Sequence, residues 1–291
     1  MIRIDWKTLD SIGQMYVNRL MEHAEDHPKS NLNKRIKEIL GPHLFRELIL
    51  CPPHRLKSFA CPDELAPNDV YSVYDSFFGS CGRDNVNNAD WLLDRLGIKV
   101  CPYCNRSYTF TIKGKRGVRP ELDHFYPRSV KAYKHLAISF YNLIPSCPMC
   151  NHQKKVDVFD FHPYYGMVDG SGRIPKFRVD DGKVVYDANH YPILFPDKPE
   201  IMIENPNANT DVLRLESLYR HHSDYVKEIL DKILAYNSAL YAPLISAFQG
   251  MGRTPEEIDR LIWGNYITDD EQPKRPMAKL TKDILTQFGL L

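Results

Sequence analysis

Two C-x-x-C pairs constrain this chain more than any other feature of its sequence. They are Cys101-Pro102-Tyr103-Cys104 and Cys147-Pro148-Met149-Cys150, on either side of residues 105–146. Each pair predicts a tight turn that points two sulfurs to one side, and four thiolates match the tetrahedral coordination of zinc. A four-cysteine site is coordinatively closed, so the predicted zinc is structural and contributes to folding. One pair alone would allow a thioredoxin-type redox site, but two matched pairs argue against it.

The other cysteines predict no further site. Cys51, Cys61 and Cys81 are scattered singly, so we expect ordinary thiols there. The total of seven is odd, and residues 1–13 lack the apolar core of a secretory signal, so a disulfide framework is not expected. No apolar run approaches the length that a bilayer requires, and a cytoplasmic location is expected.

The patterning of apolar residues divides the chain into three regions and predicts an α+β fold that is mainly helical. Residues 1–98 form a helical N-terminal region, residues 99–165 a small zinc-stabilised ββα module, and residues 166–291 a small hairpin followed by helices. The module differs from its flanks because it is rich in Cys, Pro, Tyr, Asn and His.

Within these regions the sequence predicts individual helices and strands. Apolar spacing and capping residues indicate helices at 9–24, 31–50, 88–96 (ending at Gly97), 213–248, 255 onward (capped by Thr254) and 275–290. Alternation and glycine-containing turns indicate strands at 107–113 and 118–124, joined through residues 114–117, and a hairpin of 176–179 with 184–187 across Asp181-Gly182.

An acid, a histidine and two asparagines surround the second cysteine pair. Asp123-His124 precedes Asn142, and Asn151 follows Cys150 directly. Hydrolysis of a phosphodiester needs a deprotonated water, which a neutral imidazole can supply near pH 7. It also needs charge stabilisation, which a hard divalent cation held by carboxylate and amide oxygens provides. Asp123 and Asn151 fit the ligand roles, and His124, on the opposite face of an extended strand, fits a different one.

This order of residues resembles the HNH, or ββα-metal, nuclease motif. The family pattern is an acid-His pair, an Asn near a second strand, and a C-x-x-C followed at once by His or Asn and then by Lys. Here that pattern reads Asp123-His124, Asn142, Cys147-x-x-Cys150-Asn151 and Lys154. The resemblance implies His124 as general base, Asp123 and Asn151 as ligands of a catalytic Mg²⁺ or Mn²⁺, and Asn142 as the residue that orients His124. With Asn151 in place of the commoner His, the chain looks like an H-N-N variant.

A narrower resemblance implies a biological setting. The run D-H-F-Y-P-R-S … N-L-I-P-S-C-P-M-C-N-x-x-K, followed by His162-Pro163-Tyr164, is similar to HNH proteins encoded beside ABC-type ATPases. Those proteins belong to bacterial antiphage systems of the Septu (PtuB-like) kind, including retron-linked ones. The similarity covers the motif region alone, and it implies an ATPase partner and a role in defence.

Charge supplies a local signal for a nucleic-acid partner. The net charge is only +1, but basic residues far outnumber acidic ones between Arg106 and Lys134. Such a face attracts phosphates, although a solvated lysine-rich hairpin would have the same composition. Arg128, Lys154 and Lys155 are the candidates to contact phosphates beside the scissile bond.

The sequence therefore predicts a metal-dependent HNH endonuclease acting on nucleic acid, with DNA favoured. The alternative is a zinc-stabilised nucleic-acid-binding or scaffold subunit without catalytic activity. The alternative predicts binding without cleavage and indifference to loss of His124. His152 and His162 stay open as accessory site members or as plain surface or loop residues.

Overall fold

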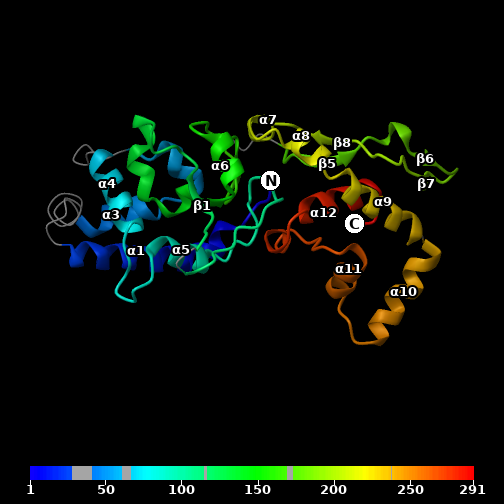
Figure 1. Ribbon diagram of the computed structural model, residues 1–291, viewed down its shortest axis with the longest axis horizontal. Helices are drawn as coiled ribbons and strands as arrows, with labels where there is room; N and C mark the ends of the chain where they lie inside the picture. Colours follow the sequence, from blue (N-terminus) through cyan, green and yellow to red (C-terminus); the bar gives the residue numbers. More distant parts are fainter. Residues whose placement is uncertain (28–40, 61–66, 115–116, 169–172, 237) are drawn as a thin grey trace. The chain divides into compact units, whose positions relative to one another are not determined.

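The computed structural model describes residues 1–27, 41–60, 67–114, 117–168, 173–236 and 238–291 (Figure 1). The chain is α+β, with many helices and small antiparallel sheets, and it forms two compact units. We call Arg3–Tyr103 with Tyr108–Gly172 the motif unit, and Arg173–Leu291 with Met1–Ile2 and Cys104–Ser107 the C-terminal unit. None of the described helices combines the length and apolar character of a membrane-spanning segment.

Helices make up most of the first half of the motif unit. They are η1 (Trp6–Leu9), α1 (Asp10–Asp26), α3 (Gly41–Ile49), η3 (Pro53–Ser58), α4 (Pro67–Phe78) and α5 (Asn88–Leu96). The prediction for α5 is confirmed, because the Asn87 side chain accepts from the backbone N–H groups of Ala89 and Asp90, and Gly97 ends the helix at φ 61°. The helix predicted at 9–24 is confirmed as α1, whereas residues 31–40 of the next one lie outside the described part.

A short hairpin and a helix form the centre of the motif unit. Strand β1 (Glu121–His124) pairs antiparallel with β2 (Leu143–Ser146), and α6 (Pro148–Lys154) follows at once and packs against β1 (Figure 1). Between the strands lie η4 (Lys131–Ile138) and η5 (Phe140–Asn142), and after α6 the two-residue strands β3 (Phe161–His162) and β4 (Gly166–Met167) pair. These elements follow the order strand, strand, helix.

No strand forms over the run predicted at 107–113, and of the run predicted at 118–124 only Glu121–His124 is a strand, β1. Only isolated bridges form there, between Val100 and Tyr108 and between Ile112 and Val118. Residues 115–116, in the predicted turn, lie outside the described part of the chain. Strand β1 pairs with β2 instead, so the predicted pairing of 107–113 with 118–124 is wrong apart from the single bridge between Ile112 and Val118.

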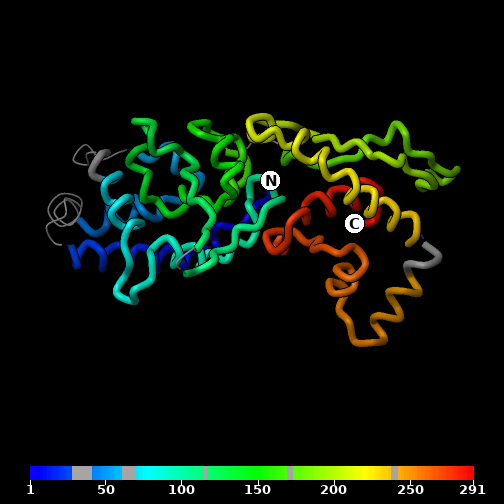
Figure 2. Tube along the Cα trace, in the orientation of Figure 1, coloured from blue at the N-terminus to red at the C-terminus, as the bar shows by residue number. Residues whose placement is uncertain are grey.

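Two two-stranded sheets begin the C-terminal unit, and they correct the predicted hairpin. Strand β5 (Lys176–Val179) pairs antiparallel with β8 (Ile201–Glu204), and β6 (Val185–Tyr186) pairs antiparallel with β7 (Pro192–Leu194). In Figure 2 the yellow-green trace of this region runs out and back side by side. Residues 181–183 form a 3₁₀ turn (η6) that Asp180 caps, so the expected pairing of 176–179 with 184–187 is wrong.

The second edge of β5 explains this difference. The backbone N–H groups of Phe177 and Val179 donate to the Asp283 carboxylate (2.9 Å) and to the Gln287 side-chain oxygen (2.8 Å). Both acceptors lie on α12 (Ala278–Gln287), so β5 has a strand on one edge and a helix on the other. No edge is left for the segment 184–187.

The helices of the C-terminal unit enclose its core. They are α7 (Ala208–Val212), α8 (Leu215–Arg220), α9 (Ser223–Ala235), α10 (Ser238–Gly250), α11 (Pro255–Trp263), η7 (Gln272–Lys274) and α12. The expected continuous helix at 213–248 is interrupted at His221-His222 and after Ala235. Thr254 caps α11 in a capping box with Glu257, as predicted. The core gathers Tyr219, Ile229, Trp263 and Leu280.

Candidate metal centre and active site

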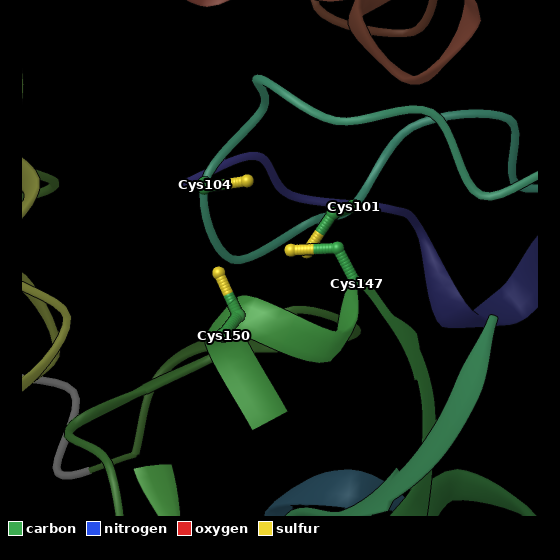
Figure 3. A group of neighbouring side chains, drawn as sticks. All are labelled: Cys101, Cys104, Cys147 and Cys150. Carbon is green, nitrogen blue, oxygen red and sulfur yellow. The ribbon is translucent and has the colours of Figure 1, made fainter. Parts of the chain in front are cut away.

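The four cysteines of the two C-x-x-C pairs lie together. All four are buried, and their Sγ atoms are within 4.8 Å of one another (Figure 3). Tetrahedral zinc with Zn–S bonds of about 2.3 Å places sulfurs roughly 3.8 Å apart, so a small inward movement completes the site. The backbone N–H of Arg106 also donates to the Cys104 sulfur (3.4 Å), which favours the thiolate. These residues fit a zinc ion.

The cluster is attached directly to the ββα elements. Cys147 is the residue before α6, and Cys150 lies in its first turn. Pro148 at the first helical position has the backbone angle that a helix start requires. A metal held by these sulfurs therefore fixes where α6 begins, and so fixes the positions of the residues that follow Cys150.

Strand alternation sorts the side chains of β1 between two faces. Glu121 and Asp123 share the face that meets α6, whereas His124 points to the other side. On the α6 side, Asn151 donates its side-chain N–H to Glu121, and Lys154 donates its ammonium to Asp123. The sequence predicted Asp123 and Asn151 as ligands of one catalytic ion. In the structure Asn151 contacts Glu121, and Asp123 contacts Lys154.

Asp123 is an internal residue with three close bonds. Only 5% of it is exposed. Tyr103 donates its hydroxyl to Oδ2 (2.6 Å), and the Lys154 ammonium lies 3.3 Å from Oδ1 and 3.2 Å from Oδ2. Burial raises the pKa of the Asp123 carboxyl, while the Lys154 charge and the Tyr103 hydroxyl act in the opposite direction.

Lys154 is the most deeply buried charged residue of this site. It is 0% exposed, it also donates to the His124 carbonyl (2.8 Å), and its ammonium lies 5.7 Å from the Phe159 ring. Burial lowers the pKa of Lys154, and Asp123 opposes that shift. The sequence placed Lys154 among the phosphate contacts, but the structure gives its ammonium internal partners instead. Lys155, the next residue, is exposed.

His124 is nearly buried and has a defined orientation. Its Nε2 lies 3.0 Å from the Ala137 carbonyl, and its ring meets Tyr74 edge-on at 4.7 Å. A carbonyl only accepts, so Nε2 carries the proton in this bond and Nδ1 keeps its lone pair. Burial is the main cause that lowers the pKa of His124 to about 3, with a smaller effect of Arg128.

Asn142 holds the loop that follows His124. It is 0% exposed, accepts from the Tyr126 N–H (2.8 Å), and donates to the carbonyls of Tyr126 (3.1 Å) and Leu136 (3.0 Å). Leu136 immediately precedes Ala137, the carbonyl partner of His124. Asn142 therefore bonds the backbone next to the carbonyl that His124 contacts.

A pocket of about 430 Å³ opens beside this group. It is lined by Tyr74, Phe78, Ala89, Arg119, Pro120, Glu121, Leu122 and Asn151. Arg128, the other predicted phosphate contact, pairs with Asp75 (3.0 Å) and lies over the rings of Tyr71 (4.9 Å) and Tyr74 (4.6 Å). Tyr74 thus contacts both His124 and Arg128.

Sequence reasoning missed three residues of this arrangement. Glu121 lies two positions before Asp123, so the period of a strand would have placed both on one face. Tyr103, inside the first cysteine pair, and Tyr74, on α4, carry no local signal. His152 is exposed on α6, whereas His162 is wholly buried with its ring 4.1 Å from Phe125, so it is a core residue.

A scan against models of known protein families found no match, and neither a search of curated proteins nor a search of solved structures found one. The structure itself shows an α+β chain whose buried four-cysteine cluster is suited to a zinc ion. Function is therefore inferred from the geometry of the site together with the motif.

Proposed function

We propose that this chain is a metal-dependent, HNH-type endonuclease that hydrolyses phosphodiester bonds in nucleic acid. One observation carries the proposal. The consecutive elements β1, β2 and α6 pack together, with His124 on the first strand and Asn151 on the helix, beside a four-cysteine cluster suited to zinc. The order of these residues is that of the HNH motif, and the ββα order of elements agrees with it.

His124 acts as the general base. Its Nε2–H is engaged by the Ala137 carbonyl, which leaves Nδ1 to take a proton from the attacking water. The Asn142 amide keeps the neighbouring backbone in place, so the ring does not have to reorganise during the reaction. Tyr74 covers the ring edge and limits access of bulk water.

Oxygen donors on β1 and α6 suit a hard cation such as Mg²⁺ or Mn²⁺. The side chains available are the Asn151 amide and the carboxylates of Glu121 and Asp123, and the motif resemblance favours Asp123. When bound, the cation supplies charge stabilisation at phosphorus and at the leaving oxygen. We assign the binding of flanking phosphates to Arg128, whose present partner is the exposed Asp75, and to the exposed Lys155.

The narrower resemblance extends the proposal to a biological setting. DNA is the favoured substrate, the chain is the nuclease subunit of a bacterial antiphage system in the cytoplasm, and an ABC-type ATPase is its partner. Co-purification from a host expressing the native neighbouring genes tests the partner. A nuclease that is fully active and always free of such a partner contradicts it.

Cleavage assays test the proposed activity. Zinc-loaded protein is incubated with supercoiled plasmid, single-stranded DNA and RNA in Mg²⁺, Mn²⁺ or EDTA. We expect cation-dependent cutting by the wild type and a loss of about 10²–10⁴-fold in His124→Ala. The matched control is His152→Ala, an exposed histidine of α6, which should cut like the wild type. Equal cutting by His124→Ala and wild type, both folded and zinc-loaded, contradicts the proposal.

One observation favours the alternative, a nucleic-acid-binding or scaffold subunit without activity. The Asp123 carboxylate is occupied by Tyr103 and Lys154, which leaves the motif acid no free oxygen in this structure. The alternative predicts binding of nucleic acid that is the same in wild type and His124→Ala, with no cutting by either. The same assays, with binding measured in parallel, separate the two functions.

A further inference from the structure

Two carboxylates on the same face of β1 have opposite surroundings. Asp123 is enclosed, with Tyr103 and Lys154 on its oxygens, whereas Glu121 is exposed and contacts Asn151. We infer that Glu121, rather than Asp123, is the β1 carboxylate that holds the divalent cation together with Asn151. Asp123 and Lys154 then form an internal ion pair that positions β1 on α6. This inference rests on the proposed function and deepens it.

The contacts of Asp123 leave no room for a cation. The Lys154 ammonium lies within 3.3 Å of both carboxylate oxygens, so a cation bound there would be placed against another positive charge. Lys154 is 0% exposed, so its charge is not solvated by bulk water. Removing it from the pair would leave a buried charge without a partner, which proteins avoid.

Glu121 lies on an open pocket, and the one basic residue of its lining, Arg119, already bonds Asn87 and pairs with Asp90. Glu121 lines this pocket of about 430 Å³ with Asn151, and Mg²⁺ keeps several of its waters when it binds to proteins. Such a hydrated ion needs open space beside its ligands, which this pocket has and the site of Asp123 lacks. The pocket also leaves space for a phosphate oxygen on the same ion.

The present contact between Glu121 and Asn151 is compatible with this role. Asn151 now presents its N–H to the Glu121 carboxylate. A half-turn of the amide presents its oxygen instead, since the two ends of an amide have nearly the same shape. Both side chains would then offer oxygen to one ion without any movement of the backbone.

The internal ion pair has a positioning role in this arrangement. Lys154 bonds Asp123 and also the His124 carbonyl at 2.8 Å. Through Lys154, α6 therefore holds the backbone of His124, the proposed general base. Asn151 and Lys154 are three residues apart and share a face of α6. The same face of α6 thus carries Lys154, which forms the internal ion pair, and, one turn earlier, Asn151, the proposed ligand.

Binding of Mn²⁺ to the zinc-loaded full chain tests the inference directly, by electron paramagnetic resonance of free Mn²⁺. We expect Glu121→Gln to raise the Mn²⁺ dissociation constant at least about tenfold, as loss of a metal contact does, with zinc content and urea midpoint unchanged. Glu47→Gln, an exposed glutamate on α3, is the matched control and should bind like the wild type.

A second variant keeps the test decisive if Asp123→Asn does not fold. Tyr103→Phe removes the hydroxyl on Asp123 and keeps the ring. We expect it to lower the urea midpoint, because a hydrogen bond to a buried carboxylate is lost. Mn²⁺ affinity should stay within about threefold of wild type, because the lost hydroxyl bonds Asp123 and neither of the proposed ligands. Unchanged Mn²⁺ binding in Glu121→Gln, with altered binding in Tyr103→Phe or Asp123→Asn, overturns the inference in favour of Asp123.

Failure of the inference and failure of the proposed function give different results. If cutting depends on His124 but Mn²⁺ binding is unchanged in Glu121→Gln, only the inference is overturned. Mn²⁺ binding that depends on Glu121, without any His124-dependent cutting, supports Glu121 as a ligand and overturns the nuclease. A wild-type protein that binds no Mn²⁺ at millimolar concentration overturns both.

Discussion

The cysteine cluster and the acidic face of β1 are two candidate metal sites in one molecule, and the sequence predicts them unequally well. For the cysteines, spacing alone was sufficient: two C-x-x-C pairs were expected to converge, and their sulfurs lie within 4.8 Å of one another. For the acids, the motif named Asp123, but the structure encloses that residue and exposes Glu121 beside Asn151.

The difference follows from the chemistry of the ligands. Four buried thiols close together have few alternative partners, so a soft metal ion is the arrangement that satisfies them. A carboxylate has several, because an ammonium, a hydroxyl, an amide or a cation can each neutralise it. The choice among these depends on residues brought in by the fold, here Lys154 and Tyr103, which no local pattern around Asp123 reveals.

Removing one cysteine of the cluster should have the largest effect of any single substitution in the two sites. Cys147→Ser deletes a ligand at the start of α6, and structural zinc contributes on the order of 10 kcal/mol in zinc-finger peptides. We expect loss of bound zinc and of cooperative unfolding of the motif unit. Zinc content by mass spectrometry and urea unfolding by circular dichroism measure the two effects.

Cys81→Ser is the matched control for that change, because Cys81 is an exposed cysteine outside the cluster. It should keep one zinc and the wild-type urea midpoint. If Cys147→Ser retained both as well, the cluster would not be a zinc site, and the contrast between the two sites would disappear.

The internal ion pair gives the second largest expected effect. Lys154→Met leaves Asp123 buried without its counter-ion, which costs about 3–5 kcal/mol of unfolding free energy. Lys155→Met, at the exposed neighbouring position, should change it by less than about 0.5 kcal/mol. Urea unfolding of zinc-loaded protein makes the comparison.

A double variant sharpens this prediction. Asp123→Leu combined with Lys154→Met replaces both charges by apolar groups, and such replacements are often neutral or stabilising. We expect it to recover most of the loss seen in Lys154→Met. A double variant that is less stable than Lys154→Met would show that Asp123 is stabilised by something other than Lys154.

Local signals predicted much of the fold. The helices α1, α5 and α11 were expected from apolar spacing and capping residues, because these act within a few residues. The hairpin at 176–187 was wrong because strand pairing is a long-range choice. The turn at Asp181-Gly182 is real, but Asp283 and Gln287 of α12 occupy the edge of β5 that the hairpin needed.

At the candidate active site, too, contacts between residues far apart in the sequence could not be predicted. The motif resemblance implied a second strand near Asn142, and β2 begins at the next residue, but the sequence did not predict that this strand pairs with β1. The sequence could not assign partners, because Tyr103 reaches Asp123 from a distant turn and Tyr74 reaches His124 from α4. Tertiary packing therefore decided which carboxylate is enclosed and which is exposed.

Acid should destabilise the motif unit through a buried histidine. Burial lowers the pKa of His162 from its ordinary 6.5 to about 3, so the folded state keeps this ring neutral while the unfolded chain takes up a proton. The stabilisation is complete above pH 6.5 and is lost as the pH falls below it. We expect a loss of about 1 kcal/mol between pH 6.5 and 5.5 from this group.

Urea unfolding of zinc-saturated protein at pH 7.5, 6.5 and 5.5 measures this loss. His162→Gln should be less stable at pH 7.5 but should lose less stability on acidification than wild type. His152→Gln, at an exposed position of α6, should follow the wild-type pH dependence. Since zinc loss in acid affects all three proteins alike, an unchanged slope in His162→Gln would contradict the assignment.

The smallest effect concerns the face of β1 opposite Glu121. Tyr74 contacts both the His124 ring (4.7 Å) and the Arg128 guanidinium (4.6 Å), so a phosphate bound to Arg128 would lie near the base. Arg128→Ala should reduce the salt dependence of DNA binding by about one counterion and weaken binding modestly. It should change the unfolding free energy by less than about 1 kcal/mol, since its pair with Asp75 is exposed.

Binding titrations at several salt concentrations measure that slope, and Arg83→Ala is the control. Arg83 forms a comparable surface pair with Asp26 but has no contact with Tyr74 or His124 among the described residues. If both variants lower the salt dependence of DNA binding equally, DNA is attracted by the general surface charge and does not bind specifically at the face of His124. If only Arg128→Ala lowers it, substrate and base share one face of β1, with the proposed Glu121 ligand reached from the edge that meets α6.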